Sequence, residues 1–112
     1  MTLNIYRIIY TKSSRNDVKA IKKYIVETFK YKELGQNFTK KVKAAIKELK
    51  KLPTSNTSIG FQYRGYDIYL KIYRTYLFFY VFDKTKKEVT LLRVLQDGMN
   101  WQFIIKEWLN QQ

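Results

Sequence analysis

The chain changes its hydrophobic period at its only proline, and this change limits the folds that it can adopt. From Val18 to Leu52, apolar residues recur every three or four positions, whereas from 59 to 95 they alternate or run together. The first pattern is typical of amphipathic helices and the second of β-strands. Because these two stretches occupy separate parts of the chain, we predict an α+β fold in which a helical hairpin packs on a mostly antiparallel sheet.

Two helices are predicted before the proline. The first has apolar residues at helical spacing: Val18, Ile21, Ile25 and Phe29. Ser14 and Asp17 match the Ser-x-x-Asp form of a helix start. The second helix repeats this spacing with Leu34, Phe38, Val42, Ala45, Leu49 and Leu52, and Pro53 ends it. A break at 31–35 makes the pair an antiparallel hairpin.

Five segments are predicted to be strands: 4–10, 59–64, 67–73, 76–82 and 88–95. The fourth reads YLFFYVF and is apolar on both faces, as expected of a central strand. After a break at 96–98, Asn100 can cap a last helix. Its apolar side either plugs the end of the sheet core or docks on a partner. The predicted order is β-α-α-β-β-β-β-α.

Length and charge suggest one basic domain. The 112 residues suit a single compact domain, 1–112, and the net charge is +13, with most of the excess before Pro53. The electric field of such a charge favours the binding of polyanions or of an acidic protein partner. Alternatively, the lysines only keep the helix faces soluble. No apolar run reaches the length of a membrane span, the N-terminus does not resemble a signal peptide, and there is no Cys. We therefore expect a cytoplasmic protein with no membrane partner.

Catalytic chemistry is restricted by what the sequence lacks. Without His or Cys there is no Ser/His/Asp or Cys/His set, and no phosphate-binding glycine loop occurs. We expect no metal and no cofactor. A metal-free RNase remains possible, because RNA supplies its own 2′-hydroxyl nucleophile; its cations would be Lys71, Arg74 and Arg93. Lys71 and Tyr73 share one predicted sheet face, opposite Leu70 and Ile72. This face is either a cationic surface open to a ligand or an ordinary solvated face with salt bridges. Basic residues interleaved with Tyr also permit nucleic-acid binding by stacking.

The order of elements and several segments resemble the RelE/ParE superfamily of type II toxin–antitoxin toxins. The resemblance covers nearly the whole chain. It rests on YRIIYTKSSRNDVKAIKKYI, on Pro53 after the second helix, on IYRTYLFFYVFDKTKKEVTLLRVL and on VLQDGMNW. The last segment is similar to the closing V/I-L-H-x-x-x-D-W pattern of the superfamily. Gln96 stands where many members have His, and Asn100 stands where many have Asp.

The resemblance implies a growth-inhibiting toxin that a cognate antitoxin neutralises. RelE-like members cut mRNA in the ribosome, and ParE-like members poison DNA gyrase. Arg74 matches the first arginine of the nuclease pattern, but Leu77 replaces the second, and residues 96–101 contain no His, Arg, Lys or Tyr. These departures favour gyrase poisoning. The alternatives are a nuclease that uses Lys71, Arg74 and Arg93, and a degenerate member that binds an antitoxin without harm.

Two further residue sets follow from the resemblance and from charge. Binding of the target is expected at the closing segment, through Asp97, Met99, Asn100 and Trp101. An acidic antitoxin is expected on the helical hairpin or the sheet edge, attracted by Lys19, Lys22, Lys40 and Lys43.

Overall fold

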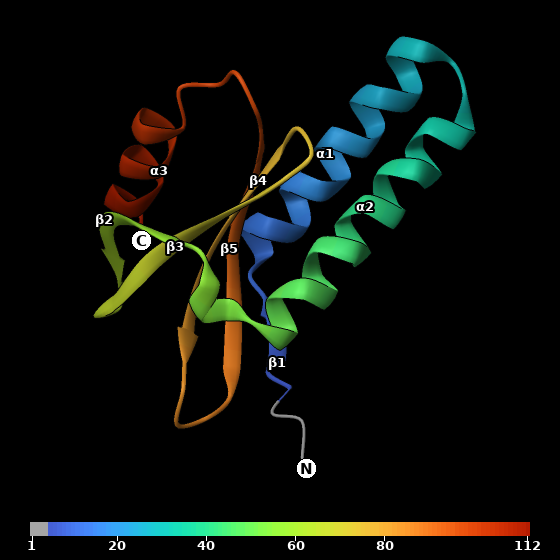
Figure 1. The fold of residues 1–112 in the computed structure, drawn as a ribbon. Coiled ribbons are helices and arrows are strands. Elements are labelled where there is room, and N and C mark those ends of the chain that lie inside the picture. Colours follow the sequence, from blue (N-terminus) through green and yellow to red (C-terminus); the bar gives the residue numbers. More distant parts are fainter. Residues whose placement is uncertain (1–4) are drawn as a thin grey trace.

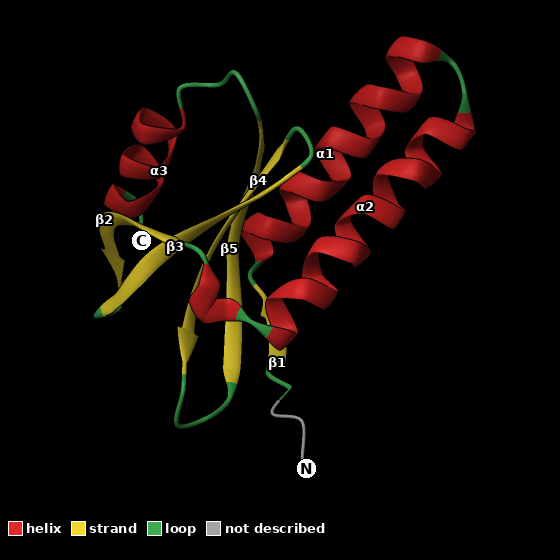
Figure 2. Cartoon of the chain, viewed as in Figure 1, coloured by secondary structure: helices red, strands yellow, loops and turns green. Residues whose placement is uncertain are grey.

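A five-stranded sheet lies between a helical hairpin and a short third helix (Figures 1 and 2). The computed structural model describes residues 5–112. The helices are α1 (Lys12–Phe29), α2 (Lys32–Lys51) and α3 (Trp101–Asn110). The strands are β1 (Arg7–Tyr10), β2 (Thr57–Tyr63), β3 (Tyr66–Tyr73), β4 (Tyr76–Asp83) and β5 (Glu88–Gln96), and a 3₁₀ turn spans Pro53–Ser55. The predicted α+β class and element order are confirmed.

The sheet has the order β1-β5-β4-β3-β2. Strand β1 pairs in parallel with β5, and the other neighbours are antiparallel. β4 is central, and its first six residues are buried, as its unbroken apolar sequence predicted. β1 is shorter than predicted: it begins at Arg7, and Asn4 lies outside the described residues.

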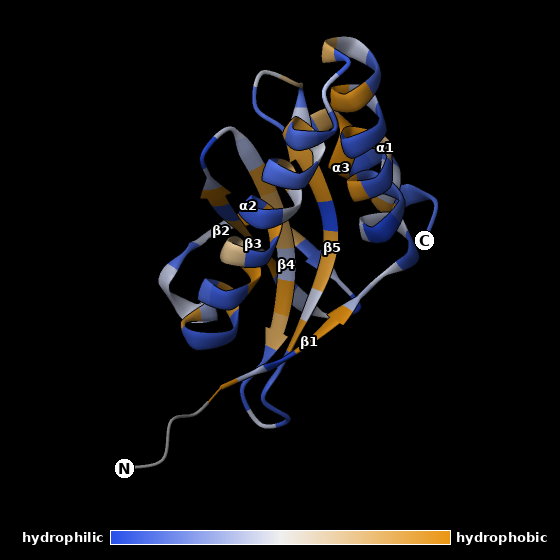
Figure 3. Ribbon diagram, turned by 90° about the vertical axis from the view of Figure 1, so that its right-hand side faces the viewer, coloured by the Kyte–Doolittle hydropathy of each residue, from blue (hydrophilic) through white to orange (hydrophobic). Residues whose placement is uncertain are grey.

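Each face of the sheet carries its own apolar core. The hairpin covers one face, where Phe38 and Leu49 of α2 pack with Phe78 and Tyr80 of β4. α3 covers part of the other face through Ile105 and Trp108, which pack on residues including Phe79 and Leu92. Figure 3 shows the apolar β4 and β5 in the centre, with polar residues on the outer sides of the helices.

The first helix starts earlier than predicted. Thr11, not Ser14, is the N-cap, and its side-chain oxygen accepts the backbone N–H of Ser14 at 3.1 Å. The same hydroxyl lies 3.0 and 2.9 Å from the carbonyl oxygens of Leu91 and Leu92. β5 carries a bulge here, which presents both carbonyls to Thr11. The cap therefore depends on a tertiary contact that the local sequence does not contain.

Part of the predicted apolar face of the hairpin is exposed. Phe29 and Leu34 are 54% and 36% exposed, because the far end of the hairpin projects beyond the sheet (Figure 1). Leu52, predicted to close the second helix, lies just after it and is 62% exposed. Helical spacing placed Phe29 and Leu34 on the correct helix side, but the sheet does not extend far enough to cover them.

Among the described residues, no helix is both long and apolar enough to cross a membrane.

Candidate functional site

The closing segment between β5 and α3 is an exposed loop fixed at both ends. The backbone N–H of Asp97 donates to the carbonyl of Thr75 in the β3–β4 turn, at 2.8 Å. Asn100 caps α3, as predicted, by accepting the N–H of Phe103 at 3.4 Å. Trp101 packs its ring 5.4 Å from that of Phe79. The loop thus has a defined position although most of its surface faces solvent.

Three of the four predicted target-binding residues are accessible. Asp97, Met99 and Asn100 are exposed, while Trp101 is half-buried against the sheet. Beside the loop, an apolar groove of about 270 Å³ runs between α1 and the start of α3. Its walls include Ile21 and Tyr24 on one side and Met99 and Ile104 on the other. This end of the sheet therefore offers an accessible loop next to an apolar groove.

Arg74 lies close to the closing segment. It occupies the β3–β4 turn with φ 60°, and its guanidinium carbon lies 5.9 Å above the ring of Tyr73. Its neighbour Thr75 is the residue bonded to Asp97. Arg74 thus lies beside the predicted target-binding loop. Arg93 also lines the groove next to this loop, together with Met99.

Lys71 does not lie on an open sheet face. It projects toward α2, where its ammonium nitrogen is 2.9 Å from Glu48, and only 12% of its side chain is exposed. Tyr73 packs against the same hairpin-side core. Ile72, expected on the apolar side, is 64% exposed, because α3 does not reach it. The interpretation of a local cationic face open to a ligand was therefore wrong: the helical hairpin covers it.

Arg93 is held by Asp17 of α1. Its guanidinium donates to both carboxylate oxygens, at 2.7 and 3.0 Å, and both side chains are more than four-fifths buried. Asp17 also accepts the backbone N–H of Val94 at 2.9 Å. Arg93 faces the α3 side of the sheet, where it lies 5.9 Å from the ring of Trp108. The sequence offered no sign of this pairing, because 76 positions separate the two residues.

The three predicted nuclease cations are consequently not brought together. Lys71 lies on the hairpin side of the sheet and Arg93 on the α3 side, and each is bound to a carboxylate. Leu77, which stands at the position of a second catalytic arginine by resemblance, is 4% exposed in the core beneath α3. An apolar, covered side chain at this position cannot contact a phosphate.

Tyr80 has a buried hydroxyl group near the centre of the sheet. Its hydroxyl donates to the carbonyl of Pro53 and accepts from the amide of Asn56 at 2.9 Å. Burial raises the pKa of Tyr80 to about 12, so its hydroxyl stays protonated near neutral pH. Tyr80 therefore serves to anchor the 3₁₀ turn to the sheet and is unsuited to act as a general base.

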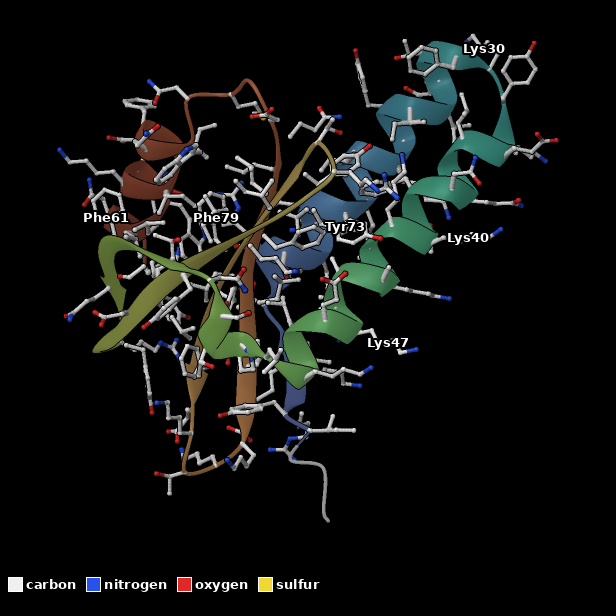
Figure 4. The ribbon with its side chains drawn as sticks, viewed as in Figure 1. Lys30, Lys40, Lys47, Phe61, Tyr73 and Phe79 are labelled. Carbon is white, nitrogen blue, oxygen red and sulfur yellow. The ribbon has the colours of Figure 1, made fainter. Side chains whose placement is uncertain are left out.

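The predicted antitoxin-binding lysines lie on the outside of the hairpin. Lys19 and Lys22 of α1, and Lys40 and Lys43 of α2, are all exposed. In Figure 4, Lys40 and Lys47 project from α2 away from the sheet. Lys43 also lines a shallow groove of about 180 Å³ between α2 and β1, whose apolar floor includes Val42 and Ile46. A groove with a basic rim thus lies next to the edge strand β1.

Within residues 5–112, no group of three or more His, Cys, Asp or Glu residues is arranged to hold a metal ion.

Comparison with known proteins identifies the family. A profile described as "ParE toxin of type II toxin-antitoxin system, parDE" matches residues 8–101. The chain belongs to the ParE toxin family. This match spans every element from β1 to the start of α3, including the closing segment. No curated protein matches the sequence.

Two solved structures resemble this ParE-family toxin. A chain of the chromosomal ParDE system of P. aeruginosa superposes with a TM-score of 0.67 at 13% identity, covering 85% of this chain and 99% of that one. A chain of the RelBE2 toxin–antitoxin complex of Mycobacterium tuberculosis superposes with a TM-score of 0.58 at 17% identity, covering 82% and 98%. These likenesses confirm the RelE/ParE fold, which serves both toxin branches.

Proposed function

We propose that this toxin inhibits growth by binding and poisoning DNA gyrase, without hydrolysing RNA. The observation that supports this proposal is the arrangement of the three candidate cations. Lys71 and Arg93 neutralise Glu48 and Asp17, on opposite sides of the sheet, and Arg74 lies in the β3–β4 turn. A nuclease needs several cations and an acid converging on one phosphate, and Lys71, Arg74 and Arg93 do not converge in this way.

The binding surface that we propose is the closing end of the sheet. Asp97, Met99 and Asn100 are exposed there, and Trp101 anchors the loop on Phe79. The adjoining groove beside Met99 can accept an apolar side chain of the target. A loop of defined position with an apolar pocket beside it suits recognition of a protein surface, because little order has to be gained on binding.

The first experiment is induction of the toxin in cells that lack its antitoxin, with pulse labelling of DNA, RNA and protein. Early loss of DNA synthesis with a DNA-damage response is expected for gyrase poisoning. Early loss of protein synthesis with cleaved mRNA would instead establish the RelE-like, ribosome-dependent endoribonuclease. Absence of any inhibition would establish a degenerate toxin that retains only antitoxin binding.

Two variants test whether the closing loop is the surface that poisons gyrase. Met99→Ala together with Asn100→Gly is expected to reduce gyrase poisoning by purified toxin at least tenfold, because both residues are exposed in the closing loop. Lys71→Gln is the matched control, since Lys71 is turned toward α2, and it is expected to keep full potency. If instead Arg74→Ala abolished mRNA cleavage, the nuclease alternative would hold.

We also propose that an acidic antitoxin binds the hairpin and the adjoining edge of the sheet. The exposed lysines and the basic rim of the α2–β1 groove provide charge complementarity, and the groove's floor accepts apolar side chains. Reversing the charge of Lys40 and Lys43 is expected to weaken binding strongly. Reversing Lys19 and Lys22 tests whether α1 contributes equally. Unchanged binding in both double variants would exclude the electrostatic interface.

A further inference from the structure

A second concave surface lies at the end of the sheet opposite the closing segment. The cleft measures about 550 Å³ and lies on the side of the sheet that α3 covers only in part. Its walls are the start of α1, the β2–β3 turn and the β4–β5 turn. β4 runs from Tyr76, opposite Gln96, to Asp83, opposite Glu88, so the length of β4 separates this cleft from the closing loop. The volume lies within the range of small-molecule sites.

Three cations from three different elements line this cleft. Lys12 comes from α1, Arg64 from the β2–β3 turn and Lys86 from the β4–β5 turn. All three side chains are exposed, and none takes part in the ion pairs formed within residues 5–112. Their positive charge is therefore available to a ligand.

The two carboxylates of the cleft are already engaged. Asp83 accepts the backbone N–H groups of Thr85 and Lys86, each at 2.9 Å, and the hydroxyl of Tyr66 at 2.7 Å. Glu88 pairs with Arg7 on the outer side of β1. Asp83 keeps its negative charge, because the groups that donate to it are neutral, and it interacts with Lys86, whereas the charge of Glu88 is compensated by Arg7. The three cations outnumber this one carboxylate, so the cleft keeps a net positive charge.

Aromatic rings hold one cation in place and offer a surface for stacking. The guanidinium of Arg64 lies 5.1 Å from the ring of Tyr63, which in turn stacks on Trp108 at 5.5 Å. The backbone of Arg64 has φ 51°, a conformation that favours glycine or asparagine, so the turn presents a long cationic side chain where a small residue would be easier to place. Tyr66 is 39% exposed beside it.

We propose that this cleft binds a nucleotide unit, with its phosphate held by Lys12, Arg64 and Lys86 and its base stacked on Tyr66. Arginine and lysine are the usual phosphate ligands, and a tyrosine ring stacks on any base. A free nucleotide and a single-stranded nucleic acid present the same chemistry. The site is independent of the gyrase proposal, because it shares no residue with the closing segment.

The test measures binding of fluorescein-labelled oligo(dT) and oligo(U) to the full-length toxin by anisotropy across a range of salt. The cleft variant carries Lys12→Gln, Arg64→Gln and Lys86→Gln, and the matched control carries Lys30→Gln, Lys32→Gln and Lys41→Gln, three exposed lysines outside the cleft. We expect the cleft variant to bind about tenfold or more weakly, with a salt slope lower by about 2, and the control to bind within about twofold of the wild type.

Each outcome decides the proposal. Equal losses in both triple variants would show non-specific attraction to a basic protein and would overturn it, as would absence of binding by the wild type. Displacement of the probe by AMP supports a free nucleotide as the ligand, and displacement only by unlabelled oligomer supports a nucleic-acid chain. Inorganic phosphate competing as well as AMP would overturn the role of Tyr66. Lys86→Gln alone lies in an exposed turn, so it tests the site even if the triple variant unfolds.

Discussion

Asp17 joins two elements through one carboxylate. It binds the guanidinium of Arg93 through both oxygens and accepts the backbone N–H of Val94. β1 ends at Tyr10, beside Leu91, so Val94 lies beyond the strand that would otherwise pair with it. The side chain of a helix thus satisfies part of a sheet edge that β1 is too short to reach.

Replacing Asp17 by Ala is expected to lower the free energy of unfolding by about 2–4 kcal/mol, because it leaves a largely buried guanidinium and a backbone N–H without an acceptor. Urea denaturation measures the change. Glu27→Ala is the control: its pair with Lys23 is exposed at 4.0 Å, and the expected cost is below about 1 kcal/mol. Equal effects of the two substitutions would contradict a structural role for Asp17.

Because of Tyr80, the folding stability of the protein is expected to depend on pH in the alkaline range. Its pKa is raised from 10.0 to about 12 in the folded protein, first because the side chain is buried. Folding therefore favours the protonated form. The resulting stabilisation is complete below pH 10 and is lost as the pH rises through about 12.

Tyr80→Phe removes this titration together with the hydrogen bonds to Pro53 and Asn56. The wild type is expected to be more stable than the variant by about 1–2 kcal/mol near neutral pH, and this difference is expected to shrink between pH 10 and about 12. Chemical denaturation at a series of pH values measures both. A difference that stays constant across that range would contradict the raised pKa.

At the scale of elements, Gly35 sets the distance between the two hairpin helices. A Cβ atom at this position would lie 2.7 Å from Cγ2 of Val26 on α1. Glycine inside a helix normally costs about 1 kcal/mol relative to alanine. Here the close approach of α1 outweighs that preference.

Gly35→Ala is accordingly expected to destabilise the protein by about 1–3 kcal/mol, although the same change in an open helix would stabilise it. Thermal unfolding measures the sign. The double variant Val26→Ala/Gly35→Ala removes the contacted methyl groups, so the added cost of Gly35→Ala should largely disappear in that background. Stabilisation by Gly35→Ala alone would show that the helices separate easily.

α3 is a structural cover as well as the continuation of the closing segment. Ile105 is fully buried in the core beneath it, and Trp108 donates its ring N–H to Ser13 at the start of α1, at 3.0 Å. The open question about this helix is thereby answered for the free toxin: its apolar side packs on the sheet.

Ile105→Ala is expected to cost about 2–4 kcal/mol of stability, because it leaves a cavity against the sheet. Phe103→Ala removes a side chain that is 60% exposed on the same helix, and the expected cost is below about 0.5 kcal/mol. Equilibrium unfolding of both variants separates packing from helix propensity. A large loss of stability in Phe103→Ala would place that residue in a contact that the free toxin does not show.

For the whole molecule, the net charge of +13 is expected to speed association with acidic partners. Association with an acidic antitoxin is expected to slow by about tenfold or more between low and high ionic strength, while dissociation changes less. Stopped-flow measurements with the cognate antitoxin test this. The variant with Lys19, Lys22, Lys40 and Lys43 changed to Gln should show a flatter salt dependence. A rate insensitive to salt would contradict electrostatic steering.

The sequence by itself determined the class and order of the elements. The change of period at Pro53, the two helical stripes and the apolar strand 76–82 depend on local geometry, since helices and strands repeat their side chains at fixed intervals. The closing pattern around Gln96 to Trp101 likewise carried the resemblance to the family. Asn100 was predicted as a cap because capping involves residues three positions apart.

Only the tertiary structure decided which charged residues are paired with one another and which remain exposed to a ligand. Lys71, Arg93 and Asp17 have the same local character as exposed residues, and their partners lie on other elements far along the chain. The Thr11 cap depends in the same way on the bulge in β5. Periodicity reports which side of an element is apolar, but not how far the neighbouring element extends or which charges it brings. The physical reason is that pairing across elements is set by packing, and packing is a property of the assembled fold.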